Sequence, residues 1–399
     1  MRIVLKFAIQ VFAFFALIIL WPFRRLVQIE LCIVAVHRFG HLGLEPEIFL
    51  GEQELLAVSD RLKRLPLKIQ LWSFGPKRRQ ANRYLVHKWS DILNVAPSWW
   101  IDALHKVGLR FRLLRLTEPV MSIRGNLNAL DQTETHLQIT EAEHRRGNAE
   151  LRKLGIDPDR PYVCLVVRDG GHYASLGEKE SDGYSFLNFD ISTFEQSALW
   201  LVEHGYQVVR MGAGTETPLS TSHPQIVDYA NSQYRSEFLD IYIAATCSFA
   251  ISTQTGPDAV CLAFRRPVCY IDVSRFSQFF FGTKLAWWNP AELWQSSSRL
   301  SLKDVLTGPV GNIKDPNDFI KYGVTQVRSD SSAITKLVAC FTESYERHFV
   351  LSESDEVVEH SVQRSIEELM GIEGRQQFGR ITAVLNPAFV RQSGDWYLV

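Results

Sequence analysis

Residues 247–272, CSFAISTQTGPDAVCLAFRRPVCYID, hold two short apolar segments separated by a polar turn and a helix-like segment. The pattern predicts a buried strand ending at Ser252, a turn, a helix with Pro257 in its first turn, and a second strand. Free backbone N–H groups at such a helix start, together with the helix dipole, form a site for a phosphate or a carboxylate. Gly256 lets a ligand approach the backbone closely. An ordinary strand–turn–helix capped by Thr255 is the alternative interpretation.

The same alternation of strands and helices extends along the chain. Strands separated by helices of about ten to fifteen residues indicate βαβ units and a parallel sheet. Two such groups follow one another, which predicts a cleft with the ligand at the carboxyl ends of the strands. The first group has strands at Gln28–Val36 and Leu67–Trp72 and a helix at Glu52–Leu65; the second has strands at Pro161–Arg168, Tyr206–Met211, Ile226–Tyr229, Cys247–Ser252 and Pro267–Ile271, and helices at Thr193–His204, Ser236–Ala245, Gly256–Phe264 and Ser331–Val350.

Two arginines stand at the ends of neighbouring predicted strands of the second group. Arg168 precedes Asp169 and two glycines, and Arg210 precedes Met211-Gly212. A guanidinium holds phosphate oxygens in a bidentate fork, so we predict that both arginines bind a phosphate. The alternative is that they form structural ion pairs with Asp169, Asp228 or Asp240.

The loop predicted after the first strand, Val36–Glu47, carries two histidines and two carboxylates. His41 or Glu45 is placed to act as a general base that removes a proton from an attacking hydroxyl. A loop histidine that only forms hydrogen bonds or caps a helix is the alternative interpretation.

The segment Phe7–Phe23 is apolar apart from Gln10 and has no charge. As a helix it would be ~25 Å long, slightly short of a ~30 Å hydrocarbon core. It ends in Trp21-Pro22-Phe23 and two arginines instead of the small residues of a signal-peptide cleavage site. The pattern favours an uncleaved membrane anchor or a monotopic helix, and the alternative is a buried core helix.

Composition and missing motifs exclude several classes of function. The 43 basic and 44 acidic residues leave a net charge of −1, without the cationic excess that nucleic acid requires. The six cysteines form no CxxC motif, which argues against a disulfide framework and a structural zinc site. The sequence has no GxSxG, Walker or GxGxxG motif and no paired-carboxylate metal loop, so hydrolase, NTPase and nicotinamide functions lack support.

The order of three segments resembles the second half of an uncharacterised bacterial family described as putative glycosyltransferases. These segments are VVRDGGHY at 166–173, YQVVRMG at 206–212 and residues 226–272, and GHLGLEPEIFL at 40–50 resembles that family's opening signature. A looser similarity exists to heptosyltransferases, in which a strand–Thr-Gly-Pro–helix turn meets the phosphates of the donor. That turn corresponds here to Thr255, Gly256 and Pro257, with Gln254 in place of the usual aspartate.

This resemblance implies a GT-B architecture, in which two Rossmann-like domains face a cleft and the second binds most of the nucleotide. It also implies a reaction without a bound metal or other cofactor, because cationic side chains and the helix start stabilise the departing diphosphate. The implied organisation is a membrane anchor helix at 1–26, an N-terminal Rossmann-like acceptor domain at 27–135, a linker at 136–160, a C-terminal Rossmann-like nucleotide-sugar-binding domain at 161–350 and a C-terminal extension at 351–399.

We therefore predict an α/β glycosyltransferase that moves a sugar from a nucleotide-sugar donor to a cell-surface polysaccharide or lipid-linked glycan. The expected partners are the donor, a glycan or lipid-linked acceptor and the inner (cytoplasmic) membrane, with the catalytic part in the cytoplasm and no nucleic acid. The alternatives are a non-catalytic protein that binds glycans or nucleotide sugars on the same fold, and a sugar-nucleotide epimerase. The predicted catalytic residues are His41 and Glu45, and the predicted donor-binding residues are Arg168, Asp169, Arg210, Ser252, Gln254, Thr255, Gly256 and Asp258.

Overall fold

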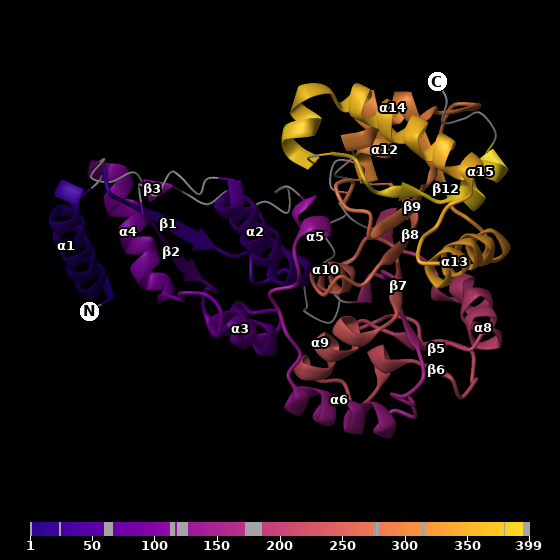
Figure 1. Ribbon diagram of the computed structural model, residues 1–399, viewed down its shortest axis with the longest axis horizontal. Coiled ribbons are helices and arrows are strands. Elements are labelled where there is room, and N and C mark those ends of the chain that lie inside the picture. The colour runs from indigo at the N-terminus through magenta and orange to yellow at the C-terminus, as the bar shows by residue number, and fades with distance from the viewer. Residues whose placement is uncertain are drawn as a thin grey trace. The chain divides into compact units, whose positions relative to one another are not determined.

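The computed structural model describes residues 2–23, 25–59, 67–111, 116–117, 127–171, 186–274, 276, 279–312, 316–378 and 380–393. The chain divides into two compact units, Met1–Ile123 and Arg124–Val399, each with a parallel sheet covered by helices (Figure 1). The predicted α/β class, the parallel sheet and the N-terminal apolar helix are thereby confirmed.

The first unit has a three-stranded parallel sheet in the order β2-β1-β3. The N-terminal helix packs on α4 through Ala13 and Leu17, which are fully buried in one cluster with Ile101 and Leu104 of α4. The small Ala13 side chain allows close approach of the two helices, which lie side by side in Figure 1. The elements are α1 (Arg2–Leu20), η1 (Trp21–Phe23), β1 (Val27–Ile33), α2 (Phe39–Ser59), β2 (Leu67–Ser73), η2 (Lys77–Arg79), α3 (Arg83–Ser90), α4 (Ser98–Phe111) and β3 (Leu116–Thr117).

The prediction of a loop at Val36–Glu47 is wrong for most of this segment. Helix α2 already begins at Phe39 and continues through Pro46. Proline has no N–H to donate to the carbonyl four residues earlier, which would leave the Leu42 oxygen without its helical partner. The indole Nε1 of the buried Trp89 donates to that oxygen at 2.9 Å. A tertiary hydrogen bond thus replaces the missing helical one, and local sequence rules miss the helix. The helix predicted at Glu52–Leu65 is the end of α2, and its residues 60–65 lie outside the described part of the chain.

The second unit is built on a seven-stranded sheet in the order β13-β9-β8-β7-β4-β5-β6, in which all neighbouring strands are parallel. Every residue of β4, β5, β7, β8 and β9 is buried, because helices cover both faces. The strands are β4 (Tyr162–Val166), β5 (Gln207–Arg210), β6 (Ile226–Val227), β7 (Phe249–Ser252), β8 (Val268–Val273), β9 (Ala286–Pro290) and β13 (Val384–Leu385).

Helices α6, α9 and α10 pack together on one side of this sheet, and α8 and α13 pack together on the other (Figure 1). A separate antiparallel sheet of β10 (Glu292–Gln295), β11 (Ser298–Arg299) and β12 (Val324–Val327) lies between β9 and α13 in the sequence. The helices are α5 (Ala129–Gln132), α6 (Glu141–Lys153), η4 (Ile191–Phe194), α8 (Glu195–Glu203), η5 (Tyr229–Asn231), α9 (Glu237–Thr246), α10 (Gly256–Ala263), α11 (Leu302–Thr307), η7 (Pro309–Asn312), α12 (Pro316–Tyr322), α13 (Ser331–Glu346), α14 (Glu353–Phe378) and α15 (Pro387–Ser393).

Two predicted segments, the linker and the C-terminal extension, contain elements that pack in the second unit. Residues 136–160, predicted as a linker, include α6, whose Asn148 Oδ1 accepts a hydrogen bond from the Tyr242 hydroxyl of α9 at 2.6 Å. A Cβ at Gly147 would lie 2.3 Å from the Tyr242 ring, so only glycine allows this packing. Within residues 351–399, the predicted C-terminal extension, β13 pairs with β9 at the edge of the main sheet. Both segments belong to the second unit.

The buried carboxyl group of Glu359 in α14 makes the stability of the second unit depend on pH. Its Oε2 accepts from the backbone N–H of Leu385 in β13 at 2.9 Å. Burial raises the pKa of Glu359 from 4.5 to about 8, although this hydrogen bond and one from Gln363 lower it. Because the pKa is raised in the folded state, the protonated group contributes its full stability below pH 4.5, and this stability is lost as the pH rises through 8.

We expect the Glu359→Gln variant to lose less stability than the parent protein between pH 6 and pH 9, because the amide oxygen still accepts from Leu385 and cannot ionise. Urea unfolding at several pH values measures this difference. The control is Glu356→Gln, which removes an exposed carboxylate from the same helix. If the free energy of unfolding changes equally with pH in all three proteins, the raised pKa of Glu359 is contradicted.

Candidate functional site

The candidate site lies at the carboxyl edge of the main sheet, between β4 and β7. These two strands are neighbours, with Val166 opposite Ser252 at their ends. The chain adds β5 and β6 on one side of β4 and then adds β7 and β8 on the other side. The connections therefore leave in opposite directions at this point, and open α/β sheets bind ligands outside the strand ends at such a point.

Hydrogen bonds connect the two strand-end loops at this point. The backbone N–H of Arg168 donates to the Thr253 hydroxyl at 2.9 Å, so the loop after β4 is tied to the loop after β7. The Arg168 carbonyl in turn accepts from the backbone N–H of Phe189 at 2.9 Å. Thr253 is 1 % exposed, and its short side chain holds the two loops together.

The turn that joins β7 to α10 has an unusual backbone. Gln254 adopts φ 58°, the left-handed region that residues other than glycine seldom occupy. Its Oε1 accepts from the backbone N–H of Ser274, just after β8, at 3.2 Å. This contact helps to hold a conformation that costs roughly 1–3 kcal/mol and that is frequent at functional sites. The turn aims the start of α10 at the edge of the sheet, as the sequence predicts.

A buried carboxyl group lies at the start of α10. Asp258 Oδ2 accepts from the Ser252 hydroxyl at 2.5 Å and from the backbone N–H of Thr255 at 2.8 Å. Burial raises the pKa of Asp258 from 3.8 to about 7, and the hydrogen bonds from Ser252 and Thr255 oppose that rise. At neutral pH a large fraction of Asp258 is therefore protonated. The helix start then keeps much of its positive potential, which favours an anionic ligand.

A cationic residue that the sequence analysis did not select lies close to these loops. Arg328 follows β12, and its guanidinium lies 3.6 Å above the Phe189 ring and donates to the Phe186 carbonyl. Its Nη1 is buried and has no hydrogen-bond partner among the described residues. Burial lowers the pKa of Arg328 to about 10. The strand–Arg pattern used for Arg168 also marks Arg328, but β12 belongs to the small sheet that the sequence did not predict.

Arg210, which the sequence predicts to bind a phosphate, lies in an ion-pair network. Its side chain is fully buried, with Nη2 3.3 Å from Asp169 and Nη1 3.3 Å from Asp228. Nη1 also donates to the Thr217 carbonyl. Asp169 accepts in addition from the backbone N–H of Glu216 at 3.0 Å. This network corresponds to the alternative interpretation, in which Arg210 forms structural ion pairs. Asp169 and Asp228 neutralise the charge of Arg210, and the contacts with Thr217 and Glu216 hold the loop after β5.

The predicted donor-binding residues therefore form two sets. Arg210 and Asp169 form the structural network, in which Asp169 Oδ1 also accepts from Gly171 N at 3.2 Å. The second set lies at the ends of β4 and β7 and at the start of α10: Arg168, Ser252, Gln254, Thr255, Gly256 and Asp258.

The two predicted catalytic residues are hydrogen-bonded to each other in the first unit. His41 Nδ1 lies 2.7 Å from Glu45 Oε1, one helical turn apart at the start of α2. The Glu45 side chain is 4 % exposed and that of His41 is 23 % exposed. A carboxylate bound to Nδ1 fixes the imidazole and favours the tautomer in which Nε2 accepts a proton. The pair thus has the arrangement of a general base with its positioning carboxylate.

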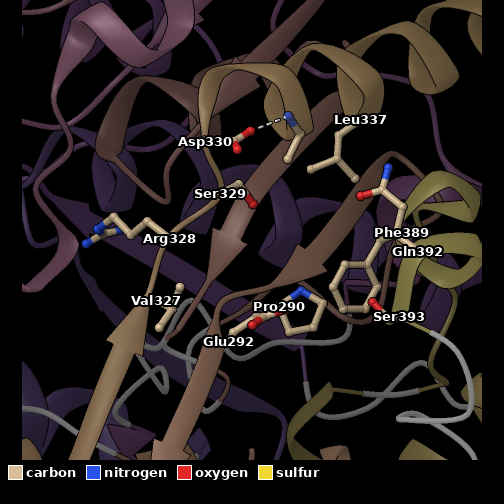
Figure 2. Close-up of a pocket in the computed structure, with 11 residues that line it drawn as sticks. Pro290, Glu292, Val327, Arg328, Ser329, Asp330, Leu337, Phe389, Gln392 and Ser393 are labelled. Carbon is tan, nitrogen blue, oxygen red and sulfur yellow. Dashed lines mark hydrogen bonds between the residues drawn. The ribbon is translucent and has the colours of Figure 1, made fainter.

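A cavity of 290 Å³ opens near the carboxyl end of β9 (Figure 2). Pro290, Glu292, Ser329 and Phe389 line it, and the Arg328 side chain points away from Phe389. Ser329 is fixed because its N–H and its hydroxyl each donate to Asp272 of β8 at 2.7 Å. The Asp272–Ser329 contact joins β8 to the segment that carries Arg328.

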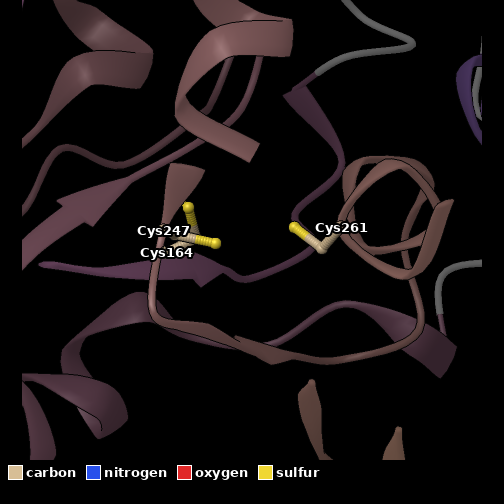
Figure 3. Close-up of side chains that lie close together, drawn as sticks. All are labelled: Cys164, Cys247 and Cys261. Carbon is tan, nitrogen blue, oxygen red and sulfur yellow. The ribbon is translucent and has the colours of Figure 1, made fainter. Parts of the chain in front are cut away.

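Three buried cysteines also lie together, although no sequence motif links them (Figure 3). The Sγ atoms of Cys164, Cys247 and Cys261 are all within 4.8 Å of one another. The Cys164 thiol donates to the Ile243 carbonyl at 3.7 Å and the Cys247 thiol to the Ala244 carbonyl at 3.4 Å. A metal would need these thiols to lose their protons beside the negative end of α9. We therefore interpret the three cysteines as core residues, two of which donate hydrogen bonds to carbonyls in the last turn of this helix.

Comparison with known proteins gives matches to solved structures only; no protein-family profile and no curated protein matches the chain. The chain is similar to Escherichia coli ADP-heptose lipopolysaccharide heptosyltransferase II, with 12% identity over 61% of this chain and 83% of that one, at a TM-score of 0.36. It is similar to a family 9 glycosyl transferase from Veillonella parvula, with 11% identity over 61% and 79% of the two chains, at a TM-score of 0.36. It is also similar to the iron-containing heptosyltransferase TibC, with 12% identity over 82% and 77%, at a TM-score of 0.34. Two of these three structures are heptosyltransferases.

The ion-pair network of Arg210 predicts a large loss of stability on truncation. The Arg210→Ala variant leaves Asp169 and Asp228 without their buried cation, and breaking such a pair typically costs about 3–5 kcal/mol. We expect urea unfolding to show this loss. Arg347→Ala removes an exposed arginine 3.9 Å from Glu343 and should change stability by less than about 1 kcal/mol. A stable Arg210→Ala protein with weakened nucleotide binding would instead restore the ligand-binding role.

Proposed function

We propose that the chain is a glycosyltransferase that binds the diphosphate of a nucleotide-sugar donor beside the ends of β4 and β7 and needs no bound metal. The observation that supports this most strongly is the Arg168–Thr253 hydrogen bond, which fixes two strand-end loops beside the start of α10. The resemblance of the Thr255-Gly256-Pro257 turn to the donor-phosphate turn of heptosyltransferases gives this site its expected ligand. In this proposal the two units have a GT-B arrangement, with the acceptor bound by the first.

In the proposed donor complex the diphosphate accepts hydrogen bonds from backbone N–H groups in the first turn of α10. Arg168 and Arg328 supply the positive charge that balances the departing nucleoside diphosphate. The protonated form of Asp258 avoids like-charge repulsion with the phosphates, so donor binding should weaken as Asp258 ionises above pH 7. Arg210 and Asp169 support the neighbouring loop and do not touch the ligand.

The proposed reaction uses the His41–Glu45 pair on the acceptor. His41 Nε2 takes the proton from the attacking hydroxyl while that oxygen forms a bond to the anomeric carbon of the sugar. The bond from this carbon to the diphosphate oxygen breaks, and the nucleoside diphosphate leaves with the electron pair. Glu45 holds Nδ1 and stabilises the imidazolium that forms.

The proposed setting is the inner (cytoplasmic) membrane, with the catalytic part in the cytoplasm, where nucleotide sugars are available. The apolar helix α1 supports membrane association: the stretch Leu5–Phe23 is long and apolar enough to span a bilayer, and only 11% of it is buried. The proposed acceptor is a cell-surface polysaccharide or lipid-linked glycan.

Donor binding tests the proposed diphosphate site. Arg168→Ala and Arg328→Ala should each weaken the affinity for nucleoside diphosphates about ten- to a hundredfold, because a hydrogen bond to a charged group contributes ~1.5–3 kcal/mol. Titration calorimetry against a panel of nucleoside diphosphates, with and without a chelator, measures the effect. Arg347→Ala is the matched control. Unchanged affinity in both variants, or binding that a chelator abolishes and Mn²⁺ restores, would contradict the proposal.

Turnover tests the proposed base. His41→Ala should lower kcat by about 10²–10⁴ with nearly unchanged nucleotide affinity. Glu45→Gln should lower kcat less, because the amide still contacts Nδ1. His37→Ala, which changes an exposed histidine two residues before α2, is the control. Release of nucleoside diphosphate identifies a transferase, whereas interconversion of sugar nucleotides would identify an epimerase. Full activity of His41→Ala would exclude this base.

A further inference from the structure

The outer face of α1 is apolar from Leu5 to Ile19. Opposite the buried Ala13 and Leu17, large apolar residues recur at three- and four-residue intervals. Such spacing puts them on one face of the helix. Phe7 is 67% exposed, Val11 37%, Phe12 67%, Phe15 57%, Ile18 40% and Ile19 69%.

This apolar face extends beyond α1 to aromatic residues at its sides. The Phe12 ring lies 5.5 Å from that of Trp100 in α4, and Trp100 lies 6.1 Å from Trp99, which is 55% exposed. Trp21 and Phe23 of η1 are exposed at the end of the helix. Tryptophan side chains favour the interface between lipid tails and headgroups, so their positions mark the border of a lipid-binding surface.

The packing of α1 against α4 argues against a helix that crosses the bilayer. Five residues of α1 share one apolar cluster with α4: Ile9, Ala13, Phe14, Leu17 and Leu20. The exposed side of α4 carries Asp102, Lys106 and Arg110. If α1 crossed the bilayer, α4 and these charges would have to enter the hydrocarbon core, which is costly. A helix lying in the membrane plane keeps α4 and its charges on the aqueous side.

We propose that α1 and η1 form a monotopic membrane-binding surface, with α1 lying in the plane of the bilayer interface. The occupant is a lipid surface, since helix–helix interfaces in membranes use small residues, whereas this face consists mainly of phenylalanine, valine and isoleucine. The exposed Lys6 and Arg25 lie near the two ends of α1 and are suited to anionic headgroups. This surface belongs to the first unit and does not depend on the proposed transferase activity.

A depth profile along α1 tests the orientation. In a Cys340→Ser background, Phe7→Cys, Val11→Cys, Phe15→Cys and Ile19→Cys each carry a polarity-sensitive fluorophore, and the other native cysteines are buried. The full chain binds vesicles of phosphatidylethanolamine and phosphatidylglycerol that contain brominated lipids. An in-plane helix gives the same shallow depth at all four sites. A profile that is deepest at Val11 and shallow at both ends would show a spanning helix and overturn the proposal.

Charged substitutions test whether a lipid surface covers the apolar face of α1. The double variant Phe15→Asp/Ile19→Asp, both sites exposed, should bind these vesicles about a hundredfold less tightly or worse. Ile320→Asp, at an 81% exposed position of α12, should bind like the parent protein. A dimer that persists with vesicles present, and that the double variant breaks, would show that a second copy covers the face and overturn the proposal. Nucleotide affinity measured on the same proteins separates this outcome from a failure of the proposed donor site.

Discussion

The parallel pairing of β4 with β7 is the constraint on which the candidate site depends. Both strands are buried along their length, and their pairing ends at Val166 and Ser252. The loops after them therefore leave the sheet side by side, close enough for Arg168 N to bond to the Thr253 hydroxyl. One further turn brings the start of α10 to the same edge. The site thus follows from strand register, which a buried apolar sheet fixes strongly.

Charge is distributed unequally along this edge. Arg210 is surrounded by Asp169, Asp228 and the Thr217 carbonyl, so its charge is already balanced inside the protein. Arg328 lies near one carboxylate, Asp272, which raises the pKa of Arg328 against the effect of burial. Its Nη1 is buried without a partner among the described residues, and such a guanidinium gains from an anion. We interpret Arg210 as a residue that holds the site together and Arg328 as one suited to bind a ligand, a distinction that their sequence contexts do not show.

Much of the second unit follows from its sequence, because short apolar segments and glycine-bounded helices alternate there. The predicted strand Cys247–Ser252 contains β7, and the predicted helix Gly256–Phe264 contains α10. Other elements depend on contacts distant in sequence. Helix α2 passes through Pro46 because Trp89 replaces the lost hydrogen bond, and β13 has two residues that only β9 orders as a strand. The sequence offers ion pairs of Arg210 as one of two alternatives, and only the folded structure decides between them. The hydrogen bond between His41 and Glu45 depends on the helix α2, which the sequence did not predict at these residues.

The claim that β4, β7 and α10 form a diphosphate site is tested most directly by a crystal structure of the full chain with a bound nucleoside diphosphate. The account predicts phosphate oxygens within hydrogen-bond distance of backbone N–H groups in the first turn of α10 and of the Arg168 guanidinium. A diphosphate bound in the cavity beside Phe389, with the start of α10 unoccupied, would contradict it.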